Sequence, residues 1–266
     1  NRDFLIYDSN SGLKANSVFS THKHSDGSIW IGNENGISRY NNNEFENFSI
    51  PDKYFADNEI WDIEELPNGN ILMLGIDYDI FEYDGTSFSR PEFFDAIYEY
   101  YVNDIYVDHE DEAIWFGAFQ MLLKYKDGEL TKFPPPSDVY WQTDLHSIFR
   151  DSKGYLWLST HAGLANFDGT SFKYLTEKEG LEGNSIYDVK EDGDGNLWVG
   201  TNKGIHILKD FDDNRMPRNI IPFSILDTYM QETIFLQFDK DWNLWQGTNG
   251  GLNYFDLSNW EEGEMA

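Results

Sequence analysis

A short apolar motif recurs six times at nearly even spacing along this chain of 266 residues. A tryptophan stands at its centre in five copies and a leucine in the other. The central residues, separated by steps of 42, 43, 42, 41 and 47, are Trp30, Leu72, Trp115, Trp157, Trp198 and Trp245. A period of about 20 to 50 residues indicates stacked units, because one such unit cannot bury its apolar face alone. We therefore expect a single domain over residues 1–266, built from six similar units.

Each unit has the pattern of several short antiparallel strands. The clearest copy alternates apolar residues over 184–189, turns at 192–196 and continues as a strand over 197–201. Alternation bounded by Gly, Asp and Asn is typical of half-buried strands in hairpins. The string Asp-Gly-Thr-Ser-Phe occurs at 84–88 and again at 168–172, and predicts a turn before a short outer strand. Four antiparallel strands per unit predict an all-β fold, a six-bladed β-propeller.

The sequence also predicts how the ring closes. Phe4 precedes Gly12 by the same spacing with which Phe172 precedes Gly180, so residues 3–7 are expected to form an outer fourth strand. The sixth unit, over 233–256, would supply the three inner strands of that blade, and its exposed edge would be covered. Trp260 competes for the same position. If that alternative holds, the chain is a piece of a longer array.

Composition excludes several classes of partner. The formal net charge is −29, from 48 acidic and 19 basic residues, and this field repels nucleic acid. The aromatic content of 17% is enough for a sizeable core, so the acidity does not indicate disorder. The chain has no cysteine and no apolar run of about 18 residues, so we expect neither disulfides nor a membrane span. Without a starting Met or a signal core, it is expected to be trimmed or processed.

The copy in the fifth unit carries a family resemblance. The string Gly180-Leu181, Asn184-x-Ile186 and Asp192 through Thr201 resembles the two-component-regulator propeller repeat. That repeat builds the extracytoplasmic sensor region of bacterial hybrid two-component systems. The resemblance implies a periplasmic or extracellular protein that binds a glycan or another small ligand and passes the event to a kinase. No kinase or response-regulator segment is recognised in the sequence, so we expect a free-standing binding protein or the sensor part of a larger one.

Repeat position separates scaffold from candidate sites, because a residue found in every blade is most simply explained by packing. We assign the tryptophan column to the scaffold on this ground. A second column, in the first strand of each unit, is assigned in the same way: Phe19, Trp61, Tyr106, His146, Tyr187 and Ile234. Asparagines 14 residues before the tryptophan column are expected to cap loop backbones: Asn16, Asn58 and Asn184.

The loops of units two to four break the repeat and pool aromatic residues. Loops that depart from a repeat are free to serve a ligand. Aromatic faces beside Asp, Gln and His suit carbohydrates or similar ligands. The predicted ligand site consists of Tyr78, Phe119, Tyr140, Trp141, Gln142 and His161. The alternative is that these aromatics pack the longer loops onto the blades.

We expect a binding protein, not an enzyme, with no catalytic residue, no bound metal and no cofactor. The six histidines fall at unrelated positions in the repeat, and no nucleophile or phosphate motif is present. One alternative is a metal-dependent propeller hydrolase that uses Glu59, Asn103, Asp104 and Asp144. Another is a protein-interaction scaffold.

Two further turns are rich in aspartate. The turn at 192–196 has the spacing of half a calcium loop, but Lys203 stands where a bidentate glutamate is needed, so we expect a hairpin turn. The turn at 239–242 would expose Trp242. Together with Trp260 it is expected to contact another domain or protein.

Overall fold

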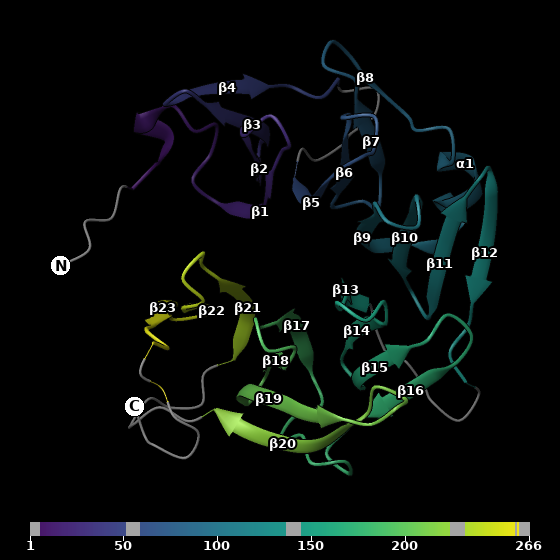
Figure 1. The fold of residues 1–266 in the computed structure, drawn as a ribbon. Helices are drawn as coiled ribbons and strands as arrows, with labels where there is room; N and C mark the ends of the chain where they lie inside the picture. The colour runs from purple at the N-terminus through teal and green to yellow at the C-terminus, as the bar shows by residue number, and fades with distance from the viewer. Residues whose placement is uncertain (1–5, 52–58, 137–144, 224–231, 259, 261–266) are drawn as a thin grey trace. The chain divides into compact units, whose positions relative to one another are not determined.

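The protein is almost entirely β-structure. The computed structural model describes residues 6–51, 59–136, 145–223, 232–258 and 260. Within them lie 23 strands, arranged in chain order as five four-stranded sheets and one three-stranded sheet (Figure 1). The helices of the described part are α1 (Phe94–Ile97) and the 3-10 turns η1 (Ser9–Ser11) and η2 (Tyr98–Tyr100). The fold is a six-bladed β-propeller of antiparallel blades, as predicted.

Contacts divide the chain into two compact units. Unit 1 comprises Asn1–Ala118 with Leu122–Lys132, and unit 2 comprises Phe119–Met121 with Phe133–Ala266. The division falls at blade three, so blades one to three belong to unit 1, apart from a few residues of blade three, and blades four to six belong to unit 2. The single-domain organisation stays a prediction.

Unit 1 carries three four-stranded sheets. Blade one contains β1 (Val18–Lys23), β2 (Ile29–Asn33), β3 (Gly36–Asn41) and β4 (Glu44–Phe48). Blade two contains β5 (Ile60–Glu65), β6 (Ile71–Gly75), β7 (Ile80–Tyr83) and the short β8 (Phe88–Ser89). Blade three contains β9 (Val102–Asp108), β10 (Ala113–Ala118), β11 (Met121–Lys126) and β12 (Glu129–Phe133). Trp30 and Ile37 of blade one pack with Met73 and Phe81 of blade two in one buried cluster. The blades therefore stack face to face.

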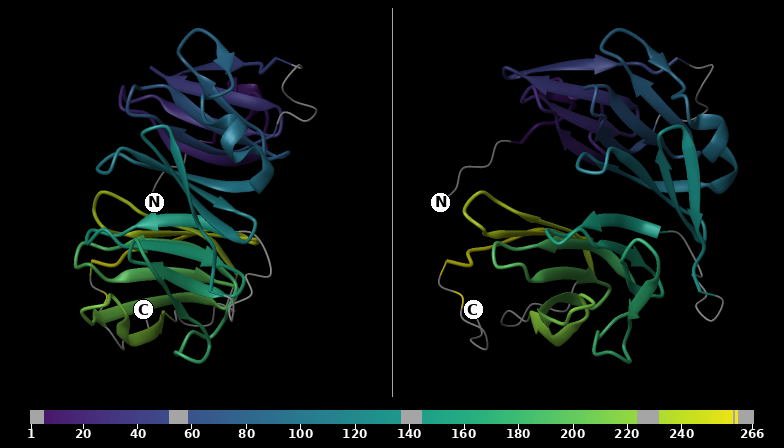
Figure 2. Two further views of the ribbon diagram at one scale, coloured as in Figure 1. Left: turned by 90° about the vertical axis from the view of Figure 1, so that its right-hand side faces the viewer. Right: turned by 45° about the vertical axis from the view of Figure 1, so that its right-hand side comes forward.

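Unit 2 is built in the same way (Figure 2). Blade four contains β13 (Leu145–Arg150), β14 (Leu156–Thr160), β15 (Gly163–Phe167) and β16 (Phe172–Leu175). Blade five contains β17 (Ile186–Glu191), β18 (Leu197–Thr201), β19 (Gly204–Phe211) and β20 (Pro217–Phe223). Blade six contains β21 (Thr233–Phe238), β22 (Leu244–Thr248) and β23 (Gly251–Phe255). Trp157 packs against blade five and Trp198 against blade six, so the tryptophan column is scaffold as predicted.

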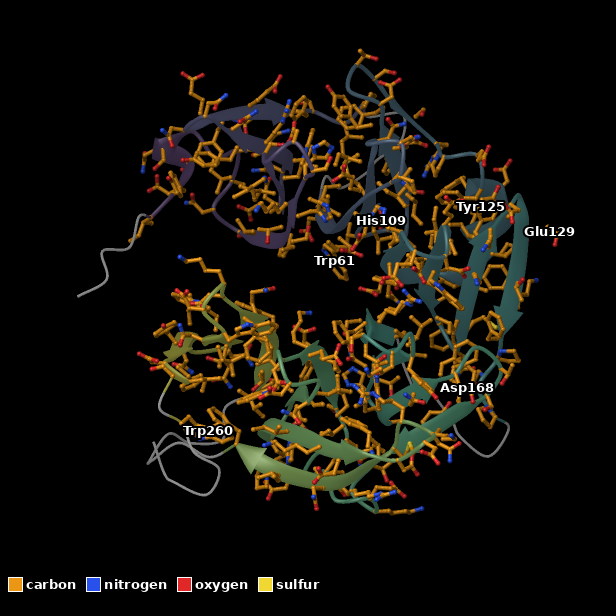
Figure 3. All side chains as sticks on the ribbon, in the orientation of Figure 1. Trp61, His109, Tyr125, Glu129, Asp168 and Trp260 are labelled. Carbon is orange, nitrogen blue, oxygen red and sulfur yellow. The ribbon has the colours of Figure 1, made fainter. Side chains whose placement is uncertain are left out.

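The first strand of every blade has a β-bulge at its second residue. The bulged residues are Phe19, Trp61, Asn103, His146, Tyr187 and Ile234. A bulge leaves one residue unpaired and re-aims its side chain. Phe19, Trp61 and Ile234 are 46%, 45% and 44% exposed, and Figure 3 shows Trp61 at the edge of β5. The assignment of this column to the scaffold was therefore wrong.

In blade three, the bulge falls at a different residue from the one predicted for that column. Tyr106, which was predicted to occupy it, pairs with Trp115, and the bulge falls at Asn103. The connection from Tyr106 to Trp115 is one residue longer than the connection from Glu64 to Leu72 in blade two. The bulge lies 11 residues before the central residue in the other five blades and 12 residues before Trp115 in blade three, whereas Tyr106 lies only 9 residues before Trp115.

An aspartate after the bulge joins neighbouring blades. The carboxylate of Asp62 accepts a hydrogen bond from the backbone N–H of Ile105, the equivalent strand of the next blade, at 2.9 Å. In unit 2 the carboxylate of Asp188 accepts the backbone N–H of Leu236 at 2.8 Å. Burial raises the pKa of Asp62 to about 6, although the N–H groups of Ile105 and Ile63 oppose the shift. These aspartates fix the spacing between first strands.

The prediction that the asparagines cap loop backbones is confirmed for Asn16 and Asn184. The side-chain oxygen of Asn16 accepts the backbone N–H of Ser9 at 2.8 Å, and that of Asn184 accepts the backbone N–H of Glu177 at 3.0 Å. Asn58 lies outside the described residues.

The predicted ring closure stays a prediction, because residues 1–5 lie outside the described part of the chain. Ile6 and Tyr7 are described and form no strand. The Tyr7 hydroxyl is 2.7 Å from that of Tyr40 in blade one. Trp260 is not in a strand either, and its neighbours fall outside the description. None of the helices in the described residues is long and apolar enough to cross a membrane.

Candidate functional site

The structure places half of the predicted site residues. Tyr78 lies in unit 1 in the β6–β7 loop, 37% exposed, and Phe119 lies in the β10–β11 loop, 47% exposed. His161 lies in unit 2, in the β14–β15 loop, and is half-buried. Tyr140, Trp141 and Gln142 lie outside the described residues. The predicted site as a whole therefore stays a prediction, and its parts are described within each unit.

In unit 1, Tyr78 of the β6–β7 loop forms an aromatic pair with Tyr101, which lies between η2 and β9. The rings of Tyr78 and Tyr101 meet edge to face, with centroids 5.3 Å apart and an interplanar angle of 82°. Both residues have a left-handed backbone, with φ of 62° and 51°. Tyr101 is 58% exposed, so the loop aromatics keep accessible faces beyond their contact with each other.

In unit 2, His161 belongs to a cluster that joins three blades. The His–Tyr cluster comprises His146, His161, Ser185, Tyr187, Glu232 and Asn249. The first strands β13, β17 and β21 lie side by side, which brings the bulged residues of β13 and β17 together. His146 and Tyr187 face each other with ring centroids 5.5 Å apart.

Two hydrogen-bonded chains make up the cluster, one from blade four to blade five and one from blade five to blade six, and ring contacts of Tyr187 with His146 and His161 join them. The Nε2 atoms of His146 and His161 are 2.9 Å apart, so one ring donates and the other accepts. His161 Nδ1 lies 3.3 Å from the Ser185 hydroxyl in blade five. The Tyr187 hydroxyl donates to the Glu232 carboxylate, whose other oxygen accepts the Asn249 side-chain amide at 2.6 Å. Polar side chains of three blades therefore lie together in this cluster.

The electrostatics keep Tyr187 a neutral donor. Burial, together with the adjacent Glu232 carboxylate, raises the pKa of Tyr187 to about 12. The phenol therefore stays protonated at physiological pH. The cluster combines flat ring faces with fixed donors and acceptors, which suits a ligand rich in hydroxyl groups.

Sequence reasoning found only one member of this cluster among the predicted site residues. His146 and Tyr187 were assigned to packing, and Glu232 and Asn249 were not singled out. One signal was available, because His146 places an imidazole in a column otherwise assigned to aromatic and apolar residues. The direction in which the His146 and Tyr187 side chains point could not be predicted, because the period-two rule for strands fails at a bulge.

The hydrolase alternative is not tested by the described residues. Among them, no group of three His, Cys, Asp or Glu side chains could hold a metal ion. The Glu59 carboxylate accepts the indole N–H of Trp61 at 3.2 Å, and the Asn103 amide donates to the Tyr101 carbonyl at 3.3 Å. Asp144 lies outside the described residues. The turn at 192–196 is a hairpin turn, in which Asp192 accepts the backbone N–H groups of Asp194 and Asn196.

The family resemblance is confirmed in blade five. A family model described as "Two component regulator propeller" matches residues 180–203. The matched residues contain strands β17 and β18 and end just before β19. No curated protein matches the chain.

Solved structures similar to the chain share its propeller fold. The extracellular domain of the hybrid two component system BT3049 from B. thetaiotaomicron has 24% sequence identity and a TM-score of 0.75. The match covers 96% of this chain and 35% of that one, so the chain spans about a third of that relative. Catalytically inactive virginiamycin B lyase from Staphylococcus aureus, solved with quinupristin, has 17% identity and a TM-score of 0.68, covering 88% and 78%. PorZ, a surface component of the type-IX secretion system of Porphyromonas gingivalis, has 12% identity and a TM-score of 0.63, covering 90% and 38%.

Proposed function

We propose that this propeller is a non-enzymatic, extracytoplasmic sensor module that binds a carbohydrate or a similar hydroxyl-rich ligand. The observation that carries the proposal is the His–Tyr cluster, where two hydrogen-bonded imidazoles of blade four lie against the neutral phenol of Tyr187, which forms a hydrogen-bonded network with the Glu232 carboxylate and Asn249 of blade six. Such a network offers both donors and acceptors to hydroxyl groups, and its rings offer flat faces to sugar C–H surfaces.

The sensory role and the location rest on similarity. The two component regulator propeller match in blade five and the likeness to an extracellular domain of a hybrid two component system support both. The excess of carboxylates fits a neutral or cationic ligand better than a phosphorylated one. Transmission to a kinase would require segments beyond this propeller.

The test is direct titration with a panel of neutral and acidic oligosaccharides, followed by calorimetry. Any glycan that binds the wild type should bind His161→Ala and Tyr187→Phe at least about tenfold more weakly, a loss of roughly 1.4 kcal/mol. His109→Ala, which removes an exposed histidine of unit 1, is the matched control and should keep full affinity. Circular dichroism of each variant excludes unfolding as the cause.

Two results would contradict the proposal. A glycan bound equally well by all three variants would place its site elsewhere. Failure of every oligosaccharide to bind would remove carbohydrate as the ligand class.

A further inference from the structure

Blade six breaks the repeat at the turn between its first two strands. In blades one, two, four and five, a glycine with a left-handed backbone occupies the fourth position: Gly27, Gly69, Gly154 and Gly195, with φ of 88°, 83°, 88° and 82°. Each donates its backbone N–H to the carbonyl three residues earlier. Trp242 makes the same hydrogen bond, to Asp239, with φ of 62°. A left-handed backbone is strained for a bulky residue, and such strain is concentrated at functional positions.

A second departure from the repeat faces Trp242. In two blades a turn serine binds the next blade: Ser25 donates to Glu65, and Ser152 donates to Glu191. Between blades five and six, Gly193 replaces the serine and Phe238 replaces the glutamate. A Cβ atom at Gly193 would lie 3.1 Å from the Trp242 indole, so glycine leaves room for that ring. The Phe238 ring lies 5.8 Å from Trp242.

Gly193, Phe238 and Trp242 form part of the lining of a pocket of about 630 Å³ in unit 2. Aromatic and acidic side chains line it, among them Asp192, Asp194, Trp198, Phe238, Trp242 and Trp260. Figure 3 shows Trp260 beside the end of β20, and its ring lies 5.8 Å from that of Trp198. Strand β17 contains Tyr187 of the His–Tyr cluster and leads into the turn at 192–196, which lines the pocket. The distance along the strand from Tyr187 to this turn is about 15 to 20 Å. The pocket is therefore separate from the candidate ligand site.

We propose that this pocket binds an arginine side chain of a polypeptide partner. A planar guanidinium stacks on an indole face and pairs with a carboxylate, and the lining of the pocket includes both the exposed Trp242 and the exposed Asp194. The net charge of −29 attracts a cationic segment and repels an acidic one.

The pocket already holds one cation against an aromatic face. Lys209 lies in its lining, with Nζ 5.8 Å from the centroid of Trp260. In the described part of the chain, no lysine or arginine stacks on Trp242. The Trp242 face is thus the position for an incoming guanidinium, and Lys209 would repel it.

The experiment titrates the protein with N-acetyl-arginine amide and with N-acetyl-citrulline amide, its neutral isostere, at low salt. Indole N–H signals in ¹⁵N NMR spectra report binding, and the loss of one signal in Trp242→Gly assigns Trp242. We expect the arginine probe to shift the Trp242 signal with a dissociation constant roughly tenfold below that of the citrulline probe. Trp242→Gly introduces the glycine found in blades one, two, four and five, so it should fold at least as well as the wild type and lose this preference.

Matched variants separate the pocket from the general acidic field. Lys209→Met and Lys240→Met change net charge equally, but Lys240 is exposed outside the pocket with 88% of its side chain accessible. Only Lys209→Met should strengthen arginine binding severalfold. Trp61→Ala, which removes an exposed indole of unit 1, should change nothing, and Asp194→Asn should weaken the arginine probe alone.

Three outcomes would overturn the proposal. Equal affinity for both probes would show that charge is not recognised. Unchanged arginine binding by Trp242→Gly or Asp194→Asn would place that binding outside the pocket. Tighter binding of tetramethylammonium than of the arginine probe would replace the guanidinium by a quaternary ammonium ligand.

Discussion

Several aspartate carboxylates accept hydrogen bonds from a neighbouring blade, and the surroundings of these carboxylates differ from blade to blade. Asp151, buried in blade four, accepts the indole N–H of Trp157 at 2.9 Å and the guanidinium Nε of Arg215 at 2.7 Å. Asp188 of blade five accepts from Leu236 and pairs with Lys190 at 2.8 Å. Asp62 accepts backbone N–H groups, and in the described residues no ion pair with a lysine or arginine accompanies them. The same residue type is therefore stabilising in some blades and costly in another.

Asp62 makes stability depend on pH. Its pKa is raised from 3.8 to about 6 by burial, so the folded state binds more protons than the unfolded state between these values. The free energy of unfolding should therefore fall as pH rises through this window, by on the order of 3 kcal/mol in total. Asp62→Asn keeps an oxygen acceptor without the charge. Its stability relative to wild type should rise by more than about 1 kcal/mol between pH 5 and pH 7, measured by urea unfolding.

Asp188→Asn is the control for this prediction, because it removes an ion pair as well as a charge. It should lower stability at neutral pH. A difference between Asp62→Asn and wild type that does not vary with pH would show that Asp62 ionises normally.

At the scale of elements, the blades stack through small residues in their second strands. A Cβ atom at Gly32 of β2 would lie 2.5 Å from the backbone carbonyl of Ile60 in the next blade. At the same repeat position Ser159 accommodates a hydroxyl, which accepts a hydrogen bond from Ser147 at 2.8 Å. Position 32 is a glycine because consecutive blades approach each other closely there, and not because a turn requires flexibility.

Gly32→Ala should consequently destabilise the protein by about 2 kcal/mol or more, because a backbone carbonyl cannot move aside as a flexible side chain can. Gly69→Ala is the comparison. Gly69 has φ of 83° and nothing within 4 Å of an added Cβ, so only the backbone penalty of about 1 kcal/mol applies. Urea midpoints of the two variants give the comparison, and equal losses would contradict the packing explanation.

At the scale of the whole molecule, charge is the dominant global property. With 48 acidic and 19 basic residues, the folded chain carries a self-repulsion that compactness increases. Local pairs such as Arg39 with Asp26, at 2.6 Å, neutralise only some of the carboxylates.

Salt should therefore stabilise this protein. Raising sodium chloride from about 20 mM to about 500 mM shortens the screening length from roughly 20 Å to roughly 4 Å, which weakens repulsion across the surface. We expect the thermal unfolding midpoint to increase by several degrees. Potassium chloride should act equally, since the effect is screening. A midpoint that falls with salt would mean that ion pairs outweigh the net repulsion.

Prediction from the sequence succeeded for some of these features and failed for others. The Trp column and the turn strings predicted the blades, because packing between repeats demands the same residue at the same place. The outward face of Phe19 and Trp61 was missed, since a bulge interrupts strand alternation without leaving a marker residue. His161 was predicted, but its partners Tyr187 and Glu232 belong to other blades, and their proximity arises only in the tertiary structure. Trp242 was expected to be an exposed turn residue, as found, whereas its pairing with Gly193 requires the blades to be compared with one another.

The bulges have a practical consequence for engineering. A bulged residue lies outside the ladder of its own strand, so exchanging it changes a surface without breaking a backbone pair. The exposed bulged residues Phe19, Trp61 and Ile234 are therefore the positions at which substitutions should leave the blades folded.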